Sequence, residues 1–243
     1  MRRLPLLAPL VASLTACTAL MSRAPGPAAS GSDSLAVDPQ RTWHYLVQLP
    51  KGYAQDGREW PLVVFLHGSG ERGADLRKVA VHGPPKLVAQ GREFPFILVS
   101  PQCPDGSWWR APEVDRFVAA VTRRYRVDPR RVYLVGLSMG GHATWDAATF
   151  NPERYAAIVP VCGAGEYAPA VVGERLKDLP VWAFHGARDE VVPPASSRER
   201  VEAINAAGGR ARLTLYPEAG HDSWTETFDD PELYTWLLGH ERR

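Results

Sequence analysis

The sequence has almost no net charge, no long apolar run and no internal repeat. Its 28 Lys and Arg residues nearly balance 27 Asp and Glu residues, and a formal charge of +1 lacks the electrostatic footprint of a nucleic-acid-binding protein. No apolar stretch reaches the roughly 18 residues that span a bilayer, and no period typical of a solenoid recurs. With 45% hydrophobic and 23% charged residues, the composition excludes wholesale disorder, a collagen-like rod and a coiled-coil rod.

The N-terminus has the layout of a secretory signal peptide. Arg2 and Arg3 supply positive charge, and residues 4–14 form an apolar stretch too short for a membrane helix. The stretch ends in Leu-Thr-Ala-Cys17, which resembles a bacterial lipobox. That resemblance implies that residues 1–16 are cleaved and that Cys17 is lipidated, which would anchor the protein to the cell envelope outside the cytoplasm, in the periplasm or at the cell surface. An ordinary signal peptide cut a few residues later, with Cys17 discarded, is the alternative.

A segment with little to bury follows. Of the 13 residues from 22 to 34, 11 are Ala, Gly, Pro or Ser. Such a composition is typical of a flexible linker. We therefore expect residues 17–39 to form a tether and residues 40–243 to form one folded domain.

Strand-like and helix-like patterns alternate beyond residue 40. Continuous apolar runs such as 61–66 are typical of strands buried on both faces of a parallel sheet, whereas Val114, Phe117 and Val121 recur at helical spacing. This alternation predicts an α/β fold, a mostly parallel sheet with helices on both faces. The expected strands are 43–49, 61–66, 96–100, 131–136, 156–161, 180–184 and 211–216. The expected helices are 75–90, 113–125, 139–150, 195–207 and 233–238.

The run Gly136-Leu-Ser138-Met-Gly140 follows an expected strand and opens an expected helix. A strand that reverses sharply into a helix holds the serine in a strained conformation with its hydroxyl exposed, and the flanking glycines keep the crossing free of side chains. The helix N-terminus adds N–H groups where an oxyanion would form. This context favours Ser138 as a nucleophile over a chance glycine-rich loop.

A serine nucleophile needs a base, and the base needs a carboxylate that orients it. Asp189 and His221 each follow a later expected strand, so all three candidates fall at the carboxyl ends of strands. Glu190 and Asp222 are rival acids. Asp189 is favoured because its place after the strand fits the order serine, acid, histidine. We expect no metal, because the histidines lack ligand spacing such as His-Glu-x-x-His.

With these motifs, residues 41–239 resemble the α/β-hydrolase superfamily. The resemblance implies a catalytic domain without a cofactor, in which Ser138 attacks, His221 is the base and Asp189 orients it.

The segment His67-Gly-Ser69-Gly looks like the oxyanion loop of that superfamily. The resemblance implies that the backbone N–H groups of Ser69 and Met139 bind the oxyanion, and that His67 braces the loop.

Segments 65–74, 100–109 and 136–141 look like secreted carboxylesterases of the feruloyl esterase and polyhydroxybutyrate depolymerase type. This implies a hydrolase acting on acyl or feruloyl-type esters, either small or carried by a polymer. The 18 residues from 162 to 179 are too few for a lid of several helices, so we expect an open cleft. A serine exopeptidase and a non-catalytic surface-binding lipoprotein are the alternatives.

Three tryptophans lie near the expected catalytic residues. Trp108 and Trp109 follow the strand expected at 96–100, and Trp224 lies three residues past His221. Each could stack on a sugar or aryl group of a substrate. Packing beneath the loops is an equally good interpretation.

Cys103 and Cys162 could form a disulfide in an exported protein. The strand order of the family would place the strands before them three positions apart, roughly 14 Å at the spacing of neighbouring strands. That separation exceeds the reach of a disulfide, so we expect two free thiols.

Overall fold

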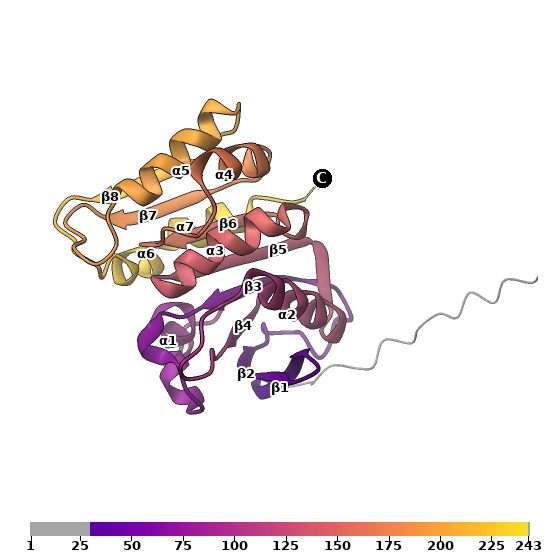
Figure 1. Ribbon diagram of the computed structural model, residues 1–243. Coiled ribbons are helices and arrows are strands. Elements are labelled where there is room, and N and C mark those ends of the chain that lie inside the picture. Colours follow the sequence, from indigo (N-terminus) through magenta and orange to yellow (C-terminus); the bar gives the residue numbers. More distant parts are fainter. Residues whose placement is uncertain (1–29, 243) are drawn as a thin grey trace, which may run out of the picture.

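The computed structural model describes residues 30–242, which fold around one sheet of eight strands (Figure 1). The strands are β1 Gly31–Asp38, β2 Arg41–Gln48, β3 Trp60–Leu66, β4 Ile97–Pro101, β5 Val127–Leu137, β6 Ala157–Val161, β7 Trp182–Gly186 and β8 Arg212–Tyr216. Their order across the sheet is β1-β2-β4-β3-β5-β6-β7-β8. β2 is antiparallel to both of its neighbours, and all the other pairs are parallel. The predicted mostly parallel sheet is confirmed.

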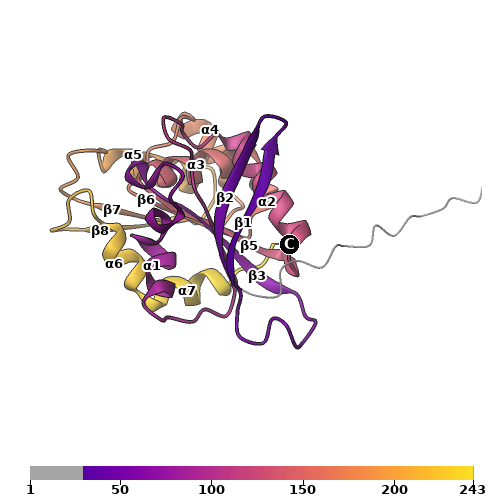
Figure 2. The same ribbon diagram turned by 90° about the horizontal axis from the view of Figure 1, so that it is seen from below.

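Helices cover both faces of this sheet (Figure 2). They are α1 Gly83–Ala89, α2 Ala111–Arg124, α3 Met139–Phe150, α4 Pro169–Leu176, α5 Ala195–Ala206, α6 Trp224–Asp229 and α7 Pro231–Leu238. Alternate residues of β3 belong to two separate cores, with Leu62 and Val64 in one and Val63 and Phe65 in the other. The first core includes side chains of α2 to α5, and the second includes side chains of α1, α6 and α7. The sheet is therefore buried on both sides, as its apolar runs predict.

The sheet begins earlier along the chain than the sequence analysis predicts. Residues 31–38, assigned there to the tether 17–39, form β1 and pair with β2. Val37 is fully buried and Leu35 packs against the same core. An edge strand packs on one face only and needs few apolar residues, so its composition resembles that of a linker.

The helix predicted over residues 75–90 is interrupted. A 3-10 helix spans Leu76–Ala80, and α1 begins only at Gly83. Gly83 has a φ of +64°, and Pro84 and Pro85 follow it. A left-handed glycine and two residues without an N–H group cannot continue a helix from the preceding turn.

Two smaller predictions are confirmed. The segment between β6 and β7 holds the short helix α4 and no larger insertion, so no large lid covers the cleft. Cys103 and Cys162 are buried free thiols, and they follow strands that lie three positions apart in the sheet.

The predicted signal peptide 1–16 and the lipidation site Cys17 lie outside the described residues. Within residues 30–242, no helix is long and apolar enough to span a bilayer.

Candidate active site

Ser138 occupies a sharp turn between β5 and α3. Its φ of 51° and ψ of −115° are a conformation that a non-glycine residue adopts only when its surroundings impose it. A methyl group on Gly140 would lie 1.9 Å from the carbonyl oxygen of Leu66, and one on Gly136 would lie 2.4 Å from that of Gly140. The glycines therefore let α3 begin in direct contact with β3 and β5, and this contact fixes the turn that carries the serine.

Three side chains that are far apart in the sequence meet at the carboxyl edge of the sheet. Nε2 of His221 lies 2.9 Å from Oγ of Ser138, and Nδ1 of His221 lies 2.8 Å from Oδ2 of Asp189. They follow β5, β7 and β8, which is the order that the sequence analysis expects. The His221 side chain is 21% exposed, whereas the Asp189 side chain is fully buried. The arrangement is that of a nucleophile, a base and an orienting group.

Asp189 is held by groups on both of its oxygens. Oδ1 accepts the N–H groups of Val191 at 2.8 Å and Val192 at 2.9 Å. Burial raises the pKa of Asp189, but the hydrogen bonds from His221 and from these two N–H groups outweigh burial and hold the pKa below its usual value. The carboxylate is therefore ionised and fixed in place at neutral pH.

His185, which the sequence analysis did not single out, contacts the same carboxylate. It is fully buried in β7, and its Nε2 lies 3.2 Å from Oδ2 of Asp189 and 3.0 Å from the carbonyl oxygen of Val192. Its Nδ1 lies 2.8 Å from Oγ of Ser197. Burial lowers the pKa of His185. A neutral ring with its hydrogen on Nε2 suits this environment, because Nε2 faces two acceptors.

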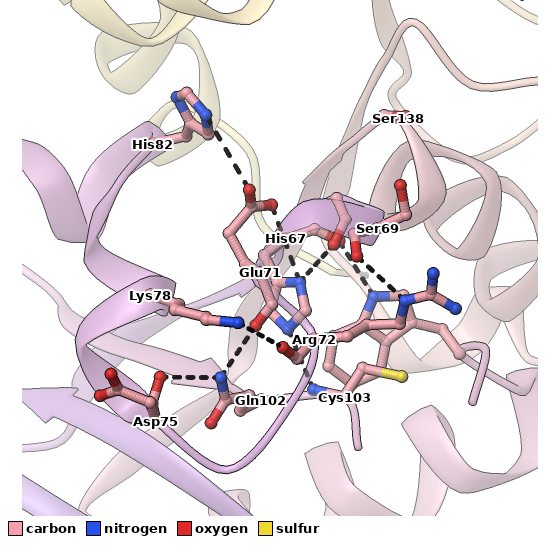
Figure 3. A network of polar contacts seen from close by, with 12 residues as sticks. His67, Ser69, Glu71, Arg72, Asp75, Lys78, His82, Gln102, Cys103 and Ser138 are labelled. Carbon is pink, nitrogen blue, oxygen red and sulfur yellow. Dashed lines mark hydrogen bonds and ion pairs between the residues drawn. The ribbon is translucent and has the colours of Figure 1, made fainter. Parts of the chain in front are cut away.

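The loop after β3 lies beside the serine (Figure 3). A methyl group on Gly68 would lie 3.7 Å from Cβ of Ser138. His67 is fully buried, and its Nε2 accepts the N–H of Cys103 at 3.0 Å. Burial lowers the pKa of His67 to about 4, so the ring is neutral and its Nδ1–H donates to the Gly68 carbonyl at 2.6 Å. That carbonyl belongs to the same peptide unit as the N–H of Ser69, so the contact fixes this N–H group.

Further contacts hold this loop and the start of α3. Arg72 donates to the carbonyl oxygen of Ser69 at 2.9 Å and to that of Ser107 at 3.1 Å, which ties the loop to the segment after β4. Gln102 donates to the carbonyl oxygen of Glu71 at 2.8 Å (Figure 3). Met139 is the first residue of α3, where N–H groups have no partner within the helix. The assignment of Ser69 and Met139 as oxyanion donors stays a prediction.

The three tryptophans have different environments. Trp109 is buried, donates to the carbonyl oxygen of His67 at 3.1 Å and packs edge-on against Trp43, so it supports the loop. These contacts favour packing beneath the loop, one of the two interpretations of this residue, and a role of Trp109 in substrate binding stays a prediction. The ring of Trp224 lies 5.3 Å from that of His221, at the site itself. Trp108 is 57% exposed.

Cys162 lies close to the Asp189–His221 pair. It has a φ of 42°, and one ligand atom from each of these three residues lies within 4.8 Å of the others, the one such group within residues 30–242. Burial raises the pKa of the Cys162 thiol to about 12. A protonated thiol is a poor metal ligand, and the aspartate and histidine already bond to each other. The donor set thus suits a hydrogen-bonded pair better than a metal ion.

Comparisons with known proteins agree with this geometry. The model of the dienelactone hydrolase family matches residues 110–230. A Salmonella typhimurium protein named as a carboxymethylenebutenolidase is 31% identical over 110 residues, which cover 43% of this chain and 41% of the relative. The crystal structure of a thermostable esterase superposes with a TM-score of 0.74 at 32% identity, covering 88% of this chain and 63% of the esterase. A ferulic acid esterase superposes with a TM-score of 0.65 at 20% identity, covering 86% of this chain and 95% of that protein, and shows a shared fold.

The chain therefore spans less than half the length of the curated relative. The α/β-hydrolase fold expected from the sequence is confirmed, and the matching family model is one that the sequence analysis did not name. We conclude that the described part of this chain has the α/β-hydrolase fold and that its segment 110–230 matches the model of the dienelactone hydrolase family.

Proposed function

We propose that this protein is a serine esterase that cleaves carboxylic esters of the acyl or feruloyl type through an acyl-enzyme on Ser138. The observation that carries the proposal is the unbroken line of contacts from Ser138 Oγ through His221 to Asp189, at 2.9 and 2.8 Å. The likeness to a thermostable esterase supports an ester as the bond that is cleaved.

In the proposed reaction, Nε2 of His221 accepts the hydroxyl proton as Ser138 Oγ attacks the ester carbonyl. The charge that forms on the carbonyl oxygen is stabilised by the N–H groups of Ser69 and Met139. His221 then gives the proton to the departing alcohol, and water releases the acyl group by the same route. Asp189 stays ionised and stabilises the imidazolium while it exists.

The test is hydrolysis of p-nitrophenyl acetate by the purified protein. Ser138→Ala should lower kcat by about 10⁴-fold or more, because the nucleophile is lost while the fold is kept. Ser32→Ala, a serine-to-alanine change on the exposed edge of the sheet, is the control and should leave kcat unchanged. A fluorophosphonate probe should label Ser138 stoichiometrically. Near-normal turnover by Ser138→Ala, or no labelling of an active protein, would refute the proposal.

We further propose that the protein acts outside the cytoplasm, anchored to the cell envelope through a lipid on Cys17. The support is the sequence Leu-Thr-Ala-Cys after an apolar stretch. Cells that express the full chain should incorporate labelled palmitate into it, and Cys17→Ser should lose the label and leave the membrane fraction, whereas Cys103→Ala should keep both. A labelled Cys17→Ser protein, or an unlabelled wild type in the soluble fraction, would contradict the anchor.

A further inference from the structure

The two hydrogen bonds of the His221 ring do not fix its plane. Nε2 and Nδ1 bond to Ser138 and Asp189 at 2.9 and 2.8 Å, and the line through these two nitrogens is an axis about which the ring can rotate. Rotation about this axis moves the N–H bond and the lone pair out of line with their partners, which weakens both hydrogen bonds. A third contact, to the side of the axis, is needed to hold the plane.

Trp224, the first residue of α6, makes such a contact. Its ring lies 5.3 Å from the His221 ring, and the two planes meet at 89°, an edge-to-face geometry that aromatic rings favour. Because Ser138 and Asp189 occupy the two ends of the axis, this contact lies to its side. The buried Nε1 of Trp224 has no hydrogen-bond partner among residues 30–242, so the orientation of the indole depends on the side chains packed against it.

His82 is one of these side chains. Its ring lies 5.4 Å from that of Trp224, at 63° between the planes. His82 directly precedes α1, and the next residue, Gly83, has a φ of +64°. A methyl group on Gly83 would lie 2.6 Å from the ring of Phe65 in β3. The backbone that carries His82 is therefore held directly against the sheet.

His82 also contacts the residue that follows the oxyanion loop. Its Nε2 lies 3.9 Å from Oε1 of Glu71 (Figure 3), beyond hydrogen-bonding range, so the attraction between them is electrostatic. Glu71 is buried in the 3-10 turn Ser69–Glu71. Its Oε2 has no hydrogen-bond partner in the described part of the chain and lies 3.2 Å from the place that a methyl group on Gly68 would take. The carboxylate thus lies against the residue that precedes Ser69.

We propose that His82 and Trp224 are positioning residues of the reaction, which connect Glu71 to the ring of His221 and fix the plane of that ring. The inference rests on the proposed function. The bridge, defined as Glu71, His82 and Trp224, joins the oxyanion loop to the base without passing through Ser138. It therefore fixes the base relative to the expected oxyanion donors, and its loss should affect the reaction step more than the binding of the ester.

The first test is the hydrolysis of p-nitrophenyl acetate by variants of the full chain. Trp224→Leu should lower kcat about tenfold and change KM less than about twofold, because a slight misplacement of the base slows the reaction without weakening ester binding. Trp224→Phe keeps an aromatic ring and should recover most of the rate. A loss confined to KM would make Trp224 a substrate contact and overturn the proposal.

The second test asks whether His82 and Trp224 act together. His82→Ala should lower kcat about fivefold, whereas His44→Ala, at an exposed histidine of β2, should leave kcat unchanged. The double variant His82→Ala/Trp224→Leu should be no slower than Trp224→Leu alone, because either change breaks the same bridge. Losses that multiply in the double variant would show that the two residues act separately and would overturn the bridge.

Nuclear magnetic resonance tests the bridge without turnover. The Nδ1 proton of His221, which bonds to Asp189, should give a far-downfield resonance that is absent from His221→Gln. This resonance should be sharp in the wild type and in His44→Ala, and broadened by exchange with water in Trp224→Leu. Should Trp224→Leu not fold, His82→Ala carries the same comparison.

The two measurements separate the bridge from the esterase proposal. If no ester is hydrolysed but the resonance broadens as described, the esterase proposal fails and the bridge stands. If esters are hydrolysed and the resonance stays sharp in folded Trp224→Leu and His82→Ala, the esterase proposal stands and the bridge is overturned.

Discussion

His185 has no role in a relay of serine, histidine and aspartate, yet its ring contacts Oδ2 of the Asp189 carboxylate, whereas the two valine N–H groups bond to Oδ1. Nε2 of His185 lies 3.2 Å from Oδ2, the same oxygen that bonds to His221 at 2.8 Å. Because Asp189 is fully buried, the direction of its carboxylate depends on these neighbours. We infer that His185 positions Asp189 and so acts on His221 indirectly.

This predicts a graded effect of substitutions at His185. His185→Leu should lower kcat for an ester about tenfold, because one hydrogen bond to a charged group is lost. His185→Gln keeps an N–H donor near the position of Nε2 and should recover most of the rate. KM should change little in either variant, since the ring lies beneath the site. Equal losses in the leucine and glutamine variants would show that the residue is needed only for packing.

At the scale of elements, the site depends on how closely α3 approaches the sheet. A methyl group on Gly140 would lie 1.9 Å from the carbonyl oxygen of Leu66 in β3, and one on Gly141 would lie 2.2 Å from that of Val161 in β6. Both partners are backbone atoms inside the sheet, and they cannot move aside without disturbing the strands.

Gly140→Ala should therefore lower the free energy of unfolding by about 1–3 kcal/mol and move the N-terminus of α3 away from the loop at Ser69. Ester turnover should fall more than stability alone explains, because the folded fraction would carry a displaced Ser138. Urea unfolding and kcat, each compared with Gly31→Ala, measure the two effects. A methyl group on Gly31 has no atom within 4 Å, so that control should match the wild type. An active, fully stable Gly140→Ala protein would contradict the close contact.

Elements buried on both faces were predictable from sequence, and edge elements were not. β3 and β5 read as apolar runs because both of their faces are covered. β1 shows the burial pattern of an edge strand, with Val37 as its one fully buried residue, so its serines and glycine resembled a linker. The prediction of one continuous helix over 75–90 did not take into account the two prolines that follow Gly83.

The site was predictable where chemistry fixes the residue type and the chain order, as for Ser138, Asp189 and His221. It was not predictable where a role depends only on environment. Trp109 and Trp108 are adjacent in the sequence, yet one is 7% and the other 57% exposed, because successive residues of an extended segment point in opposite directions. The role of His185 could not be predicted from the sequence, because a histidine within a strand is identified as a positioning residue only by the side chains that it contacts in the fold.

For the whole molecule, buried neutral histidines make stability depend on pH. The pKa of His67 falls from 6.5 to about 4 on burial. Between these two pH values the unfolded chain therefore binds a proton at His67 and the folded chain does not. This contribution to the free energy of unfolding is complete above pH 6.5 and is lost as the pH falls toward 4. The loss at pH 4 is about 3 kcal/mol. Urea unfolding between pH 4 and pH 8 should show the decline.

In the same pH range, His67→Gln should have a flatter stability profile than the wild type, whatever its stability at pH 8. Parallel profiles would assign the acid sensitivity to other groups. Nuclear magnetic resonance gives a second measurement, since the His67 ring signal of the wild type should stay at its neutral position down to about pH 5.

Arginine side chains hold two loops beside α3 in place, and this has an evolutionary consequence. The reacting groups lie at strand ends and at the start of α3, whose glycines contact the backbone of the sheet directly. Trp108 and Tyr167 lie instead on loops whose carbonyl oxygens bond to Arg72 and Arg200. Because these loops carry none of the three reacting side chains, we expect substitutions in them to change which esters are accepted and to leave the reaction at Ser138 intact. A library confined to residues 104–110 and 164–168 should accordingly yield enzymes with new preferences and undiminished turnover of simple acetates.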